Sequence, residues 1–252
     1  MVTEGATLNS FASEMRLICP NLINTIVFIG NEEPYLKAEG AVALDAEYEG
    51  VRLVARFDLE IIVPSSFPCD IPRVCLCDSS LSEVYPHASE GDGELCLGVT
   101  GDILMRLAST TSPISTFLIE ILRDNLYSVE YYRRYHAMPF GDRSHCSQGV
   151  LEHYVEFFDT NAGPSVVNLI RSSLGLVSYG RNHKCPCGSG KKALDCHGKA
   201  IERLKREVPR EMLRRDYVQV LDSLGMTQAI LAKDAARAKL RDHNHRTSQR
   251  RQ

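Results

Sequence analysis

The most regular pattern in the chain is an alternation of apolar and polar positions between residues 51 and 63. Every second residue is apolar, and four of the six residues between them are charged. Because successive side chains of a strand point to opposite faces, this pattern predicts a strand with one face on a core and one face in water. The apolar set is Val51, Leu53, Ala55, Phe57, Leu59, Ile61 and Val63.

A second strand-like run precedes the first at residues 38–48, and Glu49-Gly50 separates the two. A short break with glycine favours a tight turn, so the two runs are predicted to pair as a hairpin. Residues 64–72 contain three prolines, which cannot donate ladder hydrogen bonds, and are predicted to form a rigid turn. Residues 73–77 are predicted to form a third strand, and a polar loop at 78–94 follows.

Helical spacing of apolar residues appears before and after these strands. Residues 9–19 predict a first helix, and residues 111–135 a longer one, with Ser112 as its cap and Pro113 in its first turn. Residues 148–159 and 166–177 predict two more helices. The order predicts an α+β fold in which helices pack against an antiparallel meander.

Composition places the chain among globular proteins. Its 252 residues are 44% hydrophobic, and no apolar run approaches the roughly 18 residues that a membrane span needs. Glu4 precedes any basic residue, unlike in a secretory signal. The nine cysteines are an odd number in unlike contexts rather than a disulfide framework. We therefore expect a cytoplasmic protein.

Charge is distributed unevenly along the chain. Residues 1–180 hold 11 Lys/Arg and 24 Asp/Glu, a net −13, whereas residues 181–252 hold 18 and 8, a net +10. This asymmetry suggests two units with different partners. The basic part is either a solvated helical surface or a contact for an anionic partner.

Cys96 lies between Leu95 and Leu97, directly after a glycine-rich acidic turn. Gly91, Gly93 and Gly98 permit unusual backbone geometry, and the two leucines can anchor the segment in the core, which would turn Cys96 outward. An exposed cysteine on a fixed loop is what a nucleophile needs. The alternative is a cysteine that only packs. His87 lies nine positions before Cys96 and could approach it in space, but spacing alone does not show a catalytic pair.

This region resembles the ubiquitin-conjugating enzymes (UBC fold) over roughly residues 9–135. That family has an N-terminal helix and a meander that ends in a proline turn, whose spacing is kept here by Pro64, Phe67, Pro68 and Pro72. The family then has a His-Pro-Asn loop, for which this chain has "YPH" at 85–87. A glycine three residues before an active Cys-Leu corresponds to Gly93 and Cys96-Leu97.

The resemblance implies that Cys96 accepts a ubiquitin-like protein from an activating enzyme, holds it as a thioester and passes it to an amine of a protein substrate. His87 stands at or near the place of the family's oxyanion asparagine, and Asp102 is a candidate for orienting the incoming lysine. Asp102 has a second interpretation as a turn or helix-cap residue. The missing asparagine, the long loop and the absence of tryptophan indicate a divergent bacterial branch, whose members occur in antiphage systems. The alternative is an inactive adaptor that binds a ubiquitin-like protein or its activating enzyme.

The second cysteine cluster, "CPCGSGKKALDCHG" at 185–198, has metal-ligand spacing. Cys185, Cys187, Cys196 and His197 supply four ligands that suit tetrahedral zinc, and the glycines between them let the chain turn back. The segment resembles the SEC-C motif, a short zinc-binding appendage of many bacterial proteins. The resemblance implies a closed, structural zinc site in a docking element, whose lysines suit an acidic partner.

These patterns divide the chain into three parts. Residues 1–178 are predicted to form the UBC-like domain with extra helices, 179–200 the zinc-binding motif, and 201–252 a basic helical tail. The tail is expected to break at Pro209 and Gly225 and to end in a disordered stretch.

Overall fold

A computed structural model of the chain describes residues 2–29, 32–141, 144, 146–161, 163–230 and 232. The chain divides into two compact units, Met1–Asp142 and Arg143–Gln252. The sequence placed its boundaries at 178 and 200, whereas here the helices after residue 145 belong to the same unit as the metal-ligand motif and the helices that follow it. Within the described part of the chain, every helix is too short or too polar to cross a bilayer.

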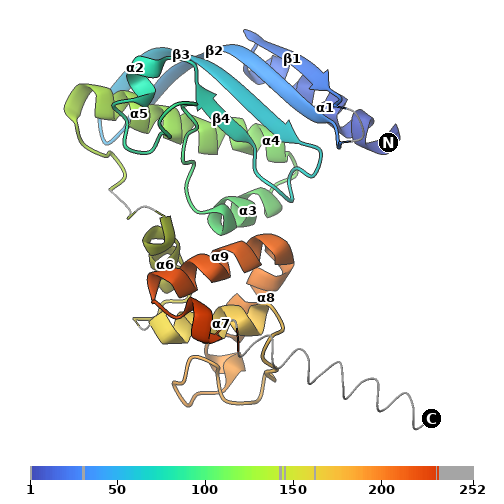
Figure 1. Ribbon diagram of the computed structural model, residues 1–252, viewed down its shortest axis with the longest axis vertical. Coiled ribbons are helices and arrows are strands. Elements are labelled where there is room, and N and C mark those ends of the chain that lie inside the picture. Colours follow the sequence, from blue (N-terminus) through green and yellow to red (C-terminus); the bar gives the residue numbers. More distant parts are fainter. Residues whose placement is uncertain are drawn as a thin grey trace. The chain divides into compact units, whose positions relative to one another are not determined.

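The first unit is built on an antiparallel sheet, as predicted (Figure 1). Its four strands among the described residues lie in the order β1 (Leu22–Val27), β2 (Tyr35–Tyr48), β3 (Val51–Pro64) and β4 (Arg73–Leu76). The predicted hairpin is confirmed, since Tyr48 pairs with Val51 across a turn in which Glu49 and Gly50 both have positive φ. Strand β1 was not predicted from the sequence.

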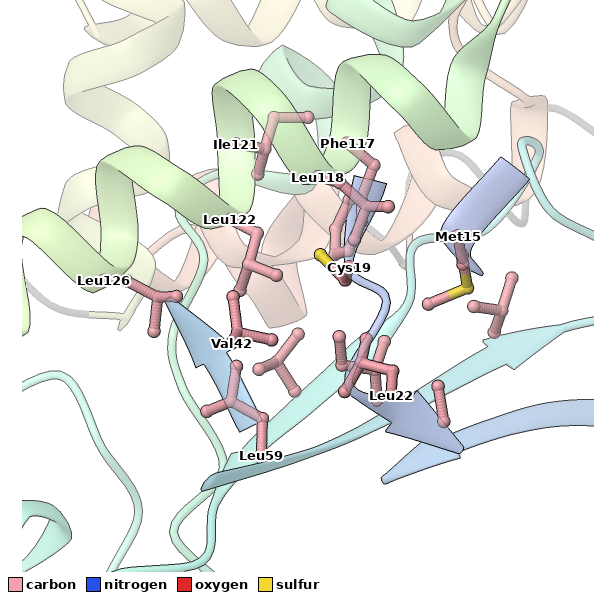
Figure 2. Close-up of a cluster of buried hydrophobic side chains, with 14 of the residues drawn as sticks. Met15, Cys19, Leu22, Val42, Leu59, Phe117, Leu118, Ile121, Leu122 and Leu126 are labelled. Atoms are coloured by element: carbon pink, nitrogen blue, oxygen red, sulfur yellow. The ribbon is translucent and has the colours of Figure 1, made fainter. Parts of the chain in front are cut away.

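The alternation in β3 has the predicted consequence. Leu53, Phe57, Leu59, Ile61 and Val63 are each at most 2% exposed, while the residues between them are exposed or half-buried. Their face of the sheet is covered by α1 (Val2–Ile18) and by the long helix described below. Figure 2 shows this core, in which Leu59 and Val42 from the sheet lie below Leu122 and Leu126.

The long predicted helix at 111–135 is present with an irregular start. It runs through α4 (Pro113–Thr116), a π-helical turn η1 (Phe117–Leu122) and α5 (Arg123–Tyr135). Pro113 occupies its first turn as expected. Ser112 is the N-cap residue, as predicted, but its side chain makes no capping hydrogen bond and instead donates to the Glu14 carboxylate of α1 at 2.5 Å.

Two short helices lie in the segment that links β4 to α4. These are α2 (Ser79–Ser82), inside the predicted polar loop, and α3 (Thr100–Ala108), which had not been predicted. The start of α3 carries no side-chain cap, since the N-cap position is Val99, and Gly101 lies in its first turn. Both features weaken the sequence signal for a helix.

The second unit is helical. It contains α6 (Cys146–Phe157), α7 (Gly163–Ser173), α8 (Gly198–Glu207) and α9 (Arg210–Ser223), with the metal-ligand motif between α7 and α8. Helix α9 packs on α6 and α7, and α7 packs on α8. The tail breaks at Pro209 and at Gly225, as predicted. The expected disordered end lies outside the described residues.

Candidate functional site

Cys96 is exposed, as the sequence predicted. Leu95 is buried and Leu97 packs against the core, so the two leucines anchor the segment and the thiol lies on the solvent side. Gly91, Gly93 and Gly98 all have positive φ. At Gly93 a Cβ atom would lie 2.5 Å from the Leu76 carbonyl oxygen, so only glycine fits at this close approach to β4.

The backbone around Cys96 is hydrogen-bonded on two sides. On one side, the Leu95 N–H donates to Val74 O at 2.8 Å, and the Leu76 N–H donates to Gly93 O at 2.9 Å. On the other side, the Cys96 N–H donates to His87 O at 2.8 Å. Residues 93–96 therefore form an extended segment between β4 and residues 87–89, which we call the Cys96 segment. The thiol is carried on fixed backbone rather than on a free loop.

His87 is brought next to the Cys96 segment through its backbone carbonyl. Its half-buried ring lies 5.7 Å from the buried ring of Tyr85, measured between centroids. Tyr85 in turn contacts Tyr132 of α5 at 5.9 Å. The "YPH" stretch is thus packed on the helix that covers the sheet, and a role of His87 toward an oxyanion stays a prediction.

Asp102 lies in the first turn of α3, and this helix begins four residues after Cys96. A carboxylate in the first turn stabilises a helix by interacting with its dipole. This position agrees with the structural interpretation of Asp102. Its role in orienting an acceptor amine stays a prediction.

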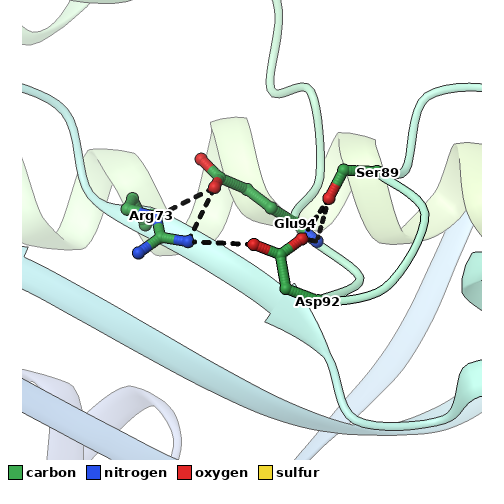
Figure 3. Close-up of polar contacts among 4 residues, drawn as sticks. All are labelled: Arg73, Ser89, Asp92 and Glu94. Carbon is green, nitrogen blue, oxygen red and sulfur yellow. Dashed lines mark hydrogen bonds and ion pairs between the residues drawn. The ribbon is translucent and has the colours of Figure 1, made fainter.

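One feature of this site was missed at the sequence level. The Arg73 guanidinium of β4 holds Asp92 and Glu94, two of the three acidic residues at positions 90–94 (Figure 3): its Nη2 lies 2.8 Å from a Glu94 oxygen and 3.3 Å from an Asp92 oxygen. Asp92 also accepts hydrogen bonds from the Ser89 hydroxyl and the Glu94 N–H. The hydrogen bond from Ser89 is the main cause of the lowered pKa of Asp92, followed by the bond from the Glu94 N–H, with a smaller contribution from Arg73. Arg73 and Glu94 are 21 residues apart, so no local pattern signals their contact.

The predicted metal ligands come together in the second unit. The three cysteine sulfurs and a ring nitrogen of His197 all lie within 4.8 Å of one another. Cys187 Sγ and Cys196 Sγ are 3.7 Å apart, and His197 Nδ1 lies 3.1 Å from Cys196 Sγ and 3.4 Å from Cys185 Sγ. Zinc–sulfur bonds of about 2.3 Å in a tetrahedron require sulfurs about 3.8 Å apart. The cluster therefore has the donor set and the spacing to hold a metal ion.

The surroundings of the cluster orient its ligands. His197 Nε2 lies 2.7 Å from the Phe158 carbonyl oxygen, an acceptor that places the proton on Nε2 and leaves Nδ1 free to bind a metal. The Ser189 N–H donates to Cys187 Sγ at 3.4 Å. Gly188 and Gly190 have positive φ in the turn between the ligands, and the Cys185 N–H donates to Lys191 O at 2.8 Å. The turn thus closes as predicted.

The surroundings of Cys185 and Cys187 shift the pKa values of these two thiols in opposite directions. Burial raises the pKa of the Cys185 thiol to about 11. Burial acts in the same direction on Cys187, but the hydrogen bonds from Ser189 together with those to Cys185 and Cys196 outweigh it and lower the pKa of that thiol to about 6.

No family model, curated protein or solved structure matches this chain.

Proposed function

We propose that the protein is a ubiquitin-conjugating-like enzyme that carries a ubiquitin-like protein as a thioester on Cys96. The observation that carries this proposal is the exposure of Cys96 on a hydrogen-bonded segment whose flanking leucines are held in the core. The order of elements around it also supports the proposal. A helix, an antiparallel meander, a proline turn, the cysteine segment and a long helix follow one another as in the UBC fold.

The proposed chemistry consists of two acyl transfers. In the first, the Cys96 thiolate attacks the thioester carbonyl of the charged activating enzyme, and the thiolate of that enzyme leaves. In the second, an amine of the substrate protein attacks the Cys96 thioester, loses a proton and forms an amide as the Cys96 thiolate leaves. Both steps depend mainly on positioning and on stabilising an oxyanion, for which His87 is the candidate near Cys96.

We further propose that the Cys/His cluster binds structural zinc. Three thiolates and one imidazole nitrogen are a frequent ligand set of structural zinc sites, and four protein ligands leave no open position for a reacting water. The exposed Lys191 and Lys192 beside the ligands suit a docking role toward an acidic partner.

A charging experiment tests the function. The protein is mixed with the activating enzyme and the modifier of the same organism and ATP, and the products are separated with and without reductant. We expect an adduct that reductant removes, a reductant-resistant oxyester with Cys96→Ser and no adduct with Cys96→Ala. Cys77→Ala, which removes another exposed thiol, serves as the matched control and is expected to charge like the wild type.

The same experiment addresses the inactive-adaptor alternative. An adaptor binds the modifier or the activating enzyme without forming a covalent adduct. Binding without charging, measured by calorimetry on the wild-type protein, therefore favours the adaptor over the enzyme.

A further inference from the structure

The Cys96 segment is short, and its register decides where the thiol points. Gly93 and Leu95 lie on the buried face, so Glu94 and Cys96 lie on the opposite face. On β4, Val74 is buried, while Arg73 is on the outer side. A slip of the segment by one residue would turn Cys96 toward the core and Leu95 toward water.

The backbone pairing that fixes this register is short. Among the described residues, the segment pairs with its neighbours through isolated bridges, Cys75 with Glu94 and Ala88 with Leu95, rather than through a continuous ladder. A pairing of this length is weakly specified by its backbone alone. Side-chain contacts at Glu94 therefore matter more here than they would in a long strand.

Arg73 supplies such a contact from the same face as Cys96. Its Nε donates to Glu94 at 2.9 Å, its Nη2 lies 2.8 Å from the same carboxylate oxygen, and Nη2 also reaches Asp92. Asp92 is in turn bonded to the Glu94 N–H and to Ser89 (Figure 3). A planar guanidinium can hold two carboxylates at fixed angles, which a lysine ammonium cannot do.

We propose that Arg73 is a positioning residue for Cys96: by clamping Glu94 and Asp92 it holds the Cys96 segment in the register that presents the thiol for acyl transfer. This inference rests on the proposed function. The side chains involved are each between 39% and 56% exposed, and exposed ion pairs add little to global stability. The expected effect of the clamp is therefore local, on the segment and on transfer.

The first measurement needs no partner protein. Amide hydrogen exchange is followed at Leu95 and Cys96, whose N–H groups are bonded to Val74 O and His87 O. In Arg73→Met we expect exchange at these two amides to be about fivefold faster, with an unchanged midpoint of global unfolding. The matched control is Arg52→Met, because Arg52 makes a similar exposed two-point pair with Asp45 on the β2–β3 hairpin. It is expected to leave both amides unchanged.

The second measurement distinguishes a loss of positioning of the Cys96 thiol from a loss of its exposure. Single-turnover charging of Arg73→Met at saturating charged activating enzyme is expected to be about tenfold slower, with the half-saturating concentration unchanged. Alkylation of Cys96 by iodoacetamide, a small neutral reagent, is expected to stay within about twofold of the wild type relative to exposed Cys69, because the thiol remains accessible. Arg73→Lys keeps the positive charge but loses the planar, two-point geometry of the guanidinium. We therefore expect it to recover only part of the charging rate.

The outcomes are distinguishable. Wild-type exchange at Leu95 and Cys96 in Arg73→Met overturns the clamp. Faster amide exchange in Arg73→Met together with a wild-type charging rate overturns the positioning role. A wild-type charging rate in Arg73→Lys overturns it as well. A wild-type protein that is never charged overturns the proposed function and with it the catalytic meaning of the clamp, while the exchange measurement still shows whether Arg73 holds the segment.

Discussion

His197 Nε2 lies 2.7 Å from the carbonyl oxygen of Phe158, directly after the end of α6. This contact ties a metal ligand to a residue 39 positions earlier in the chain, and the Ser165 hydroxyl of α7 donates to Cys187 O at 2.8 Å in the same way. The cluster is therefore part of the helical unit rather than an independent appendage. If the cluster binds a metal ion as proposed, loss of the ion is expected to destabilise the helices around it.

Removal of one ligand is expected to release the metal and loosen the helical unit. For Cys196→Ser we expect the zinc content to fall from about one per chain to near zero, and the melting temperature to fall by about 10 °C or more, because metal binding contributes to folding free energy. Elemental analysis and calorimetry of the full chain measure both.

The control for this variant is Cys69→Ser, which replaces an exposed cysteine outside the cluster and should change neither quantity. Wild-type protein that contains no metal, and whose melting is indifferent both to added zinc and to a chelator, would show that the cluster is not a metal site.

Gly93→Ala tests the close approach of the Cys96 segment to β4. The new Cβ would lie 2.5 Å from Leu76 O at a residue with φ +67°, so we expect a loss of about 1–3 kcal/mol in the free energy of unfolding. Gly91→Ala is the matched control, because Gly91 also has positive φ but no atom within 4 Å of the added Cβ. In denaturant unfolding, Gly93→Ala should have a clearly lower free energy of unfolding than Gly91→Ala. Equal losses would contradict a clash with Leu76 O as the cause.

The hydrogen bonds of Glu130 are expected to make the stability of the first unit depend on pH. Burial of its side chain, only 3% exposed, would raise the pKa of the carboxyl, but hydrogen bonds from Arg133 and Arg134 outweigh this and lower the pKa below 4.5. Because the folded pKa is the lower one, the stability that this group contributes is complete above about pH 4.5 and is lost as the pH falls through the folded pKa.

Melting of the wild type and of Glu130→Gln between pH 3 and 7 measures this contribution. Near pH 7 we expect Glu130→Gln to be less stable by about 1–2 kcal/mol, since it weakens hydrogen bonds to a charged group. The difference should shrink toward pH 3. A difference that stays constant over this range would assign the loss to packing instead.

Tyr154→Phe tests the polar contact in the core of the helical unit. The hydroxyl of Tyr154, itself fully buried, donates to the buried Asp216 carboxyl group of α9 at 2.8 Å. Removing one partner of a buried hydrogen bond is expected to cost about 1–3 kcal/mol. Tyr135→Phe, at a half-exposed tyrosine of the first unit, should cost less than about 0.5 kcal/mol in the same calorimetric measurement.

The parts of the fold that the sequence predicted are those with a local signal. The β2–β3 hairpin follows from the alternation in 51–63 and the Glu49-Gly50 turn, and the four metal ligands follow from their spacing within 13 residues. The exposure of Cys96 also followed from local features, the leucines beside it and the nearby glycines.

The missed features lack such a signal or depend on distant residues. Helix α3 begins at Thr100, and its N-cap residue, Val99, makes no side-chain capping bond, so its start could not be recognised. Ser112 has the residue type of a cap but bonds to Glu14, 98 positions away. The contacts of Arg73 with Glu94 and of His197 with Phe158 likewise exist only after the chain has folded, and no periodicity in the sequence encodes them.

The most direct test of thioester formation on Cys96 is to locate the acyl group by mass spectrometry after charging of the wild-type protein. We expect one modifier per chain, linked through its C-terminal carboxyl to the peptide that contains Cys96, and lost on treatment with a thiol. A linkage at any other cysteine, or an unmodified Cys96 beside a fully charged activating enzyme, would contradict it.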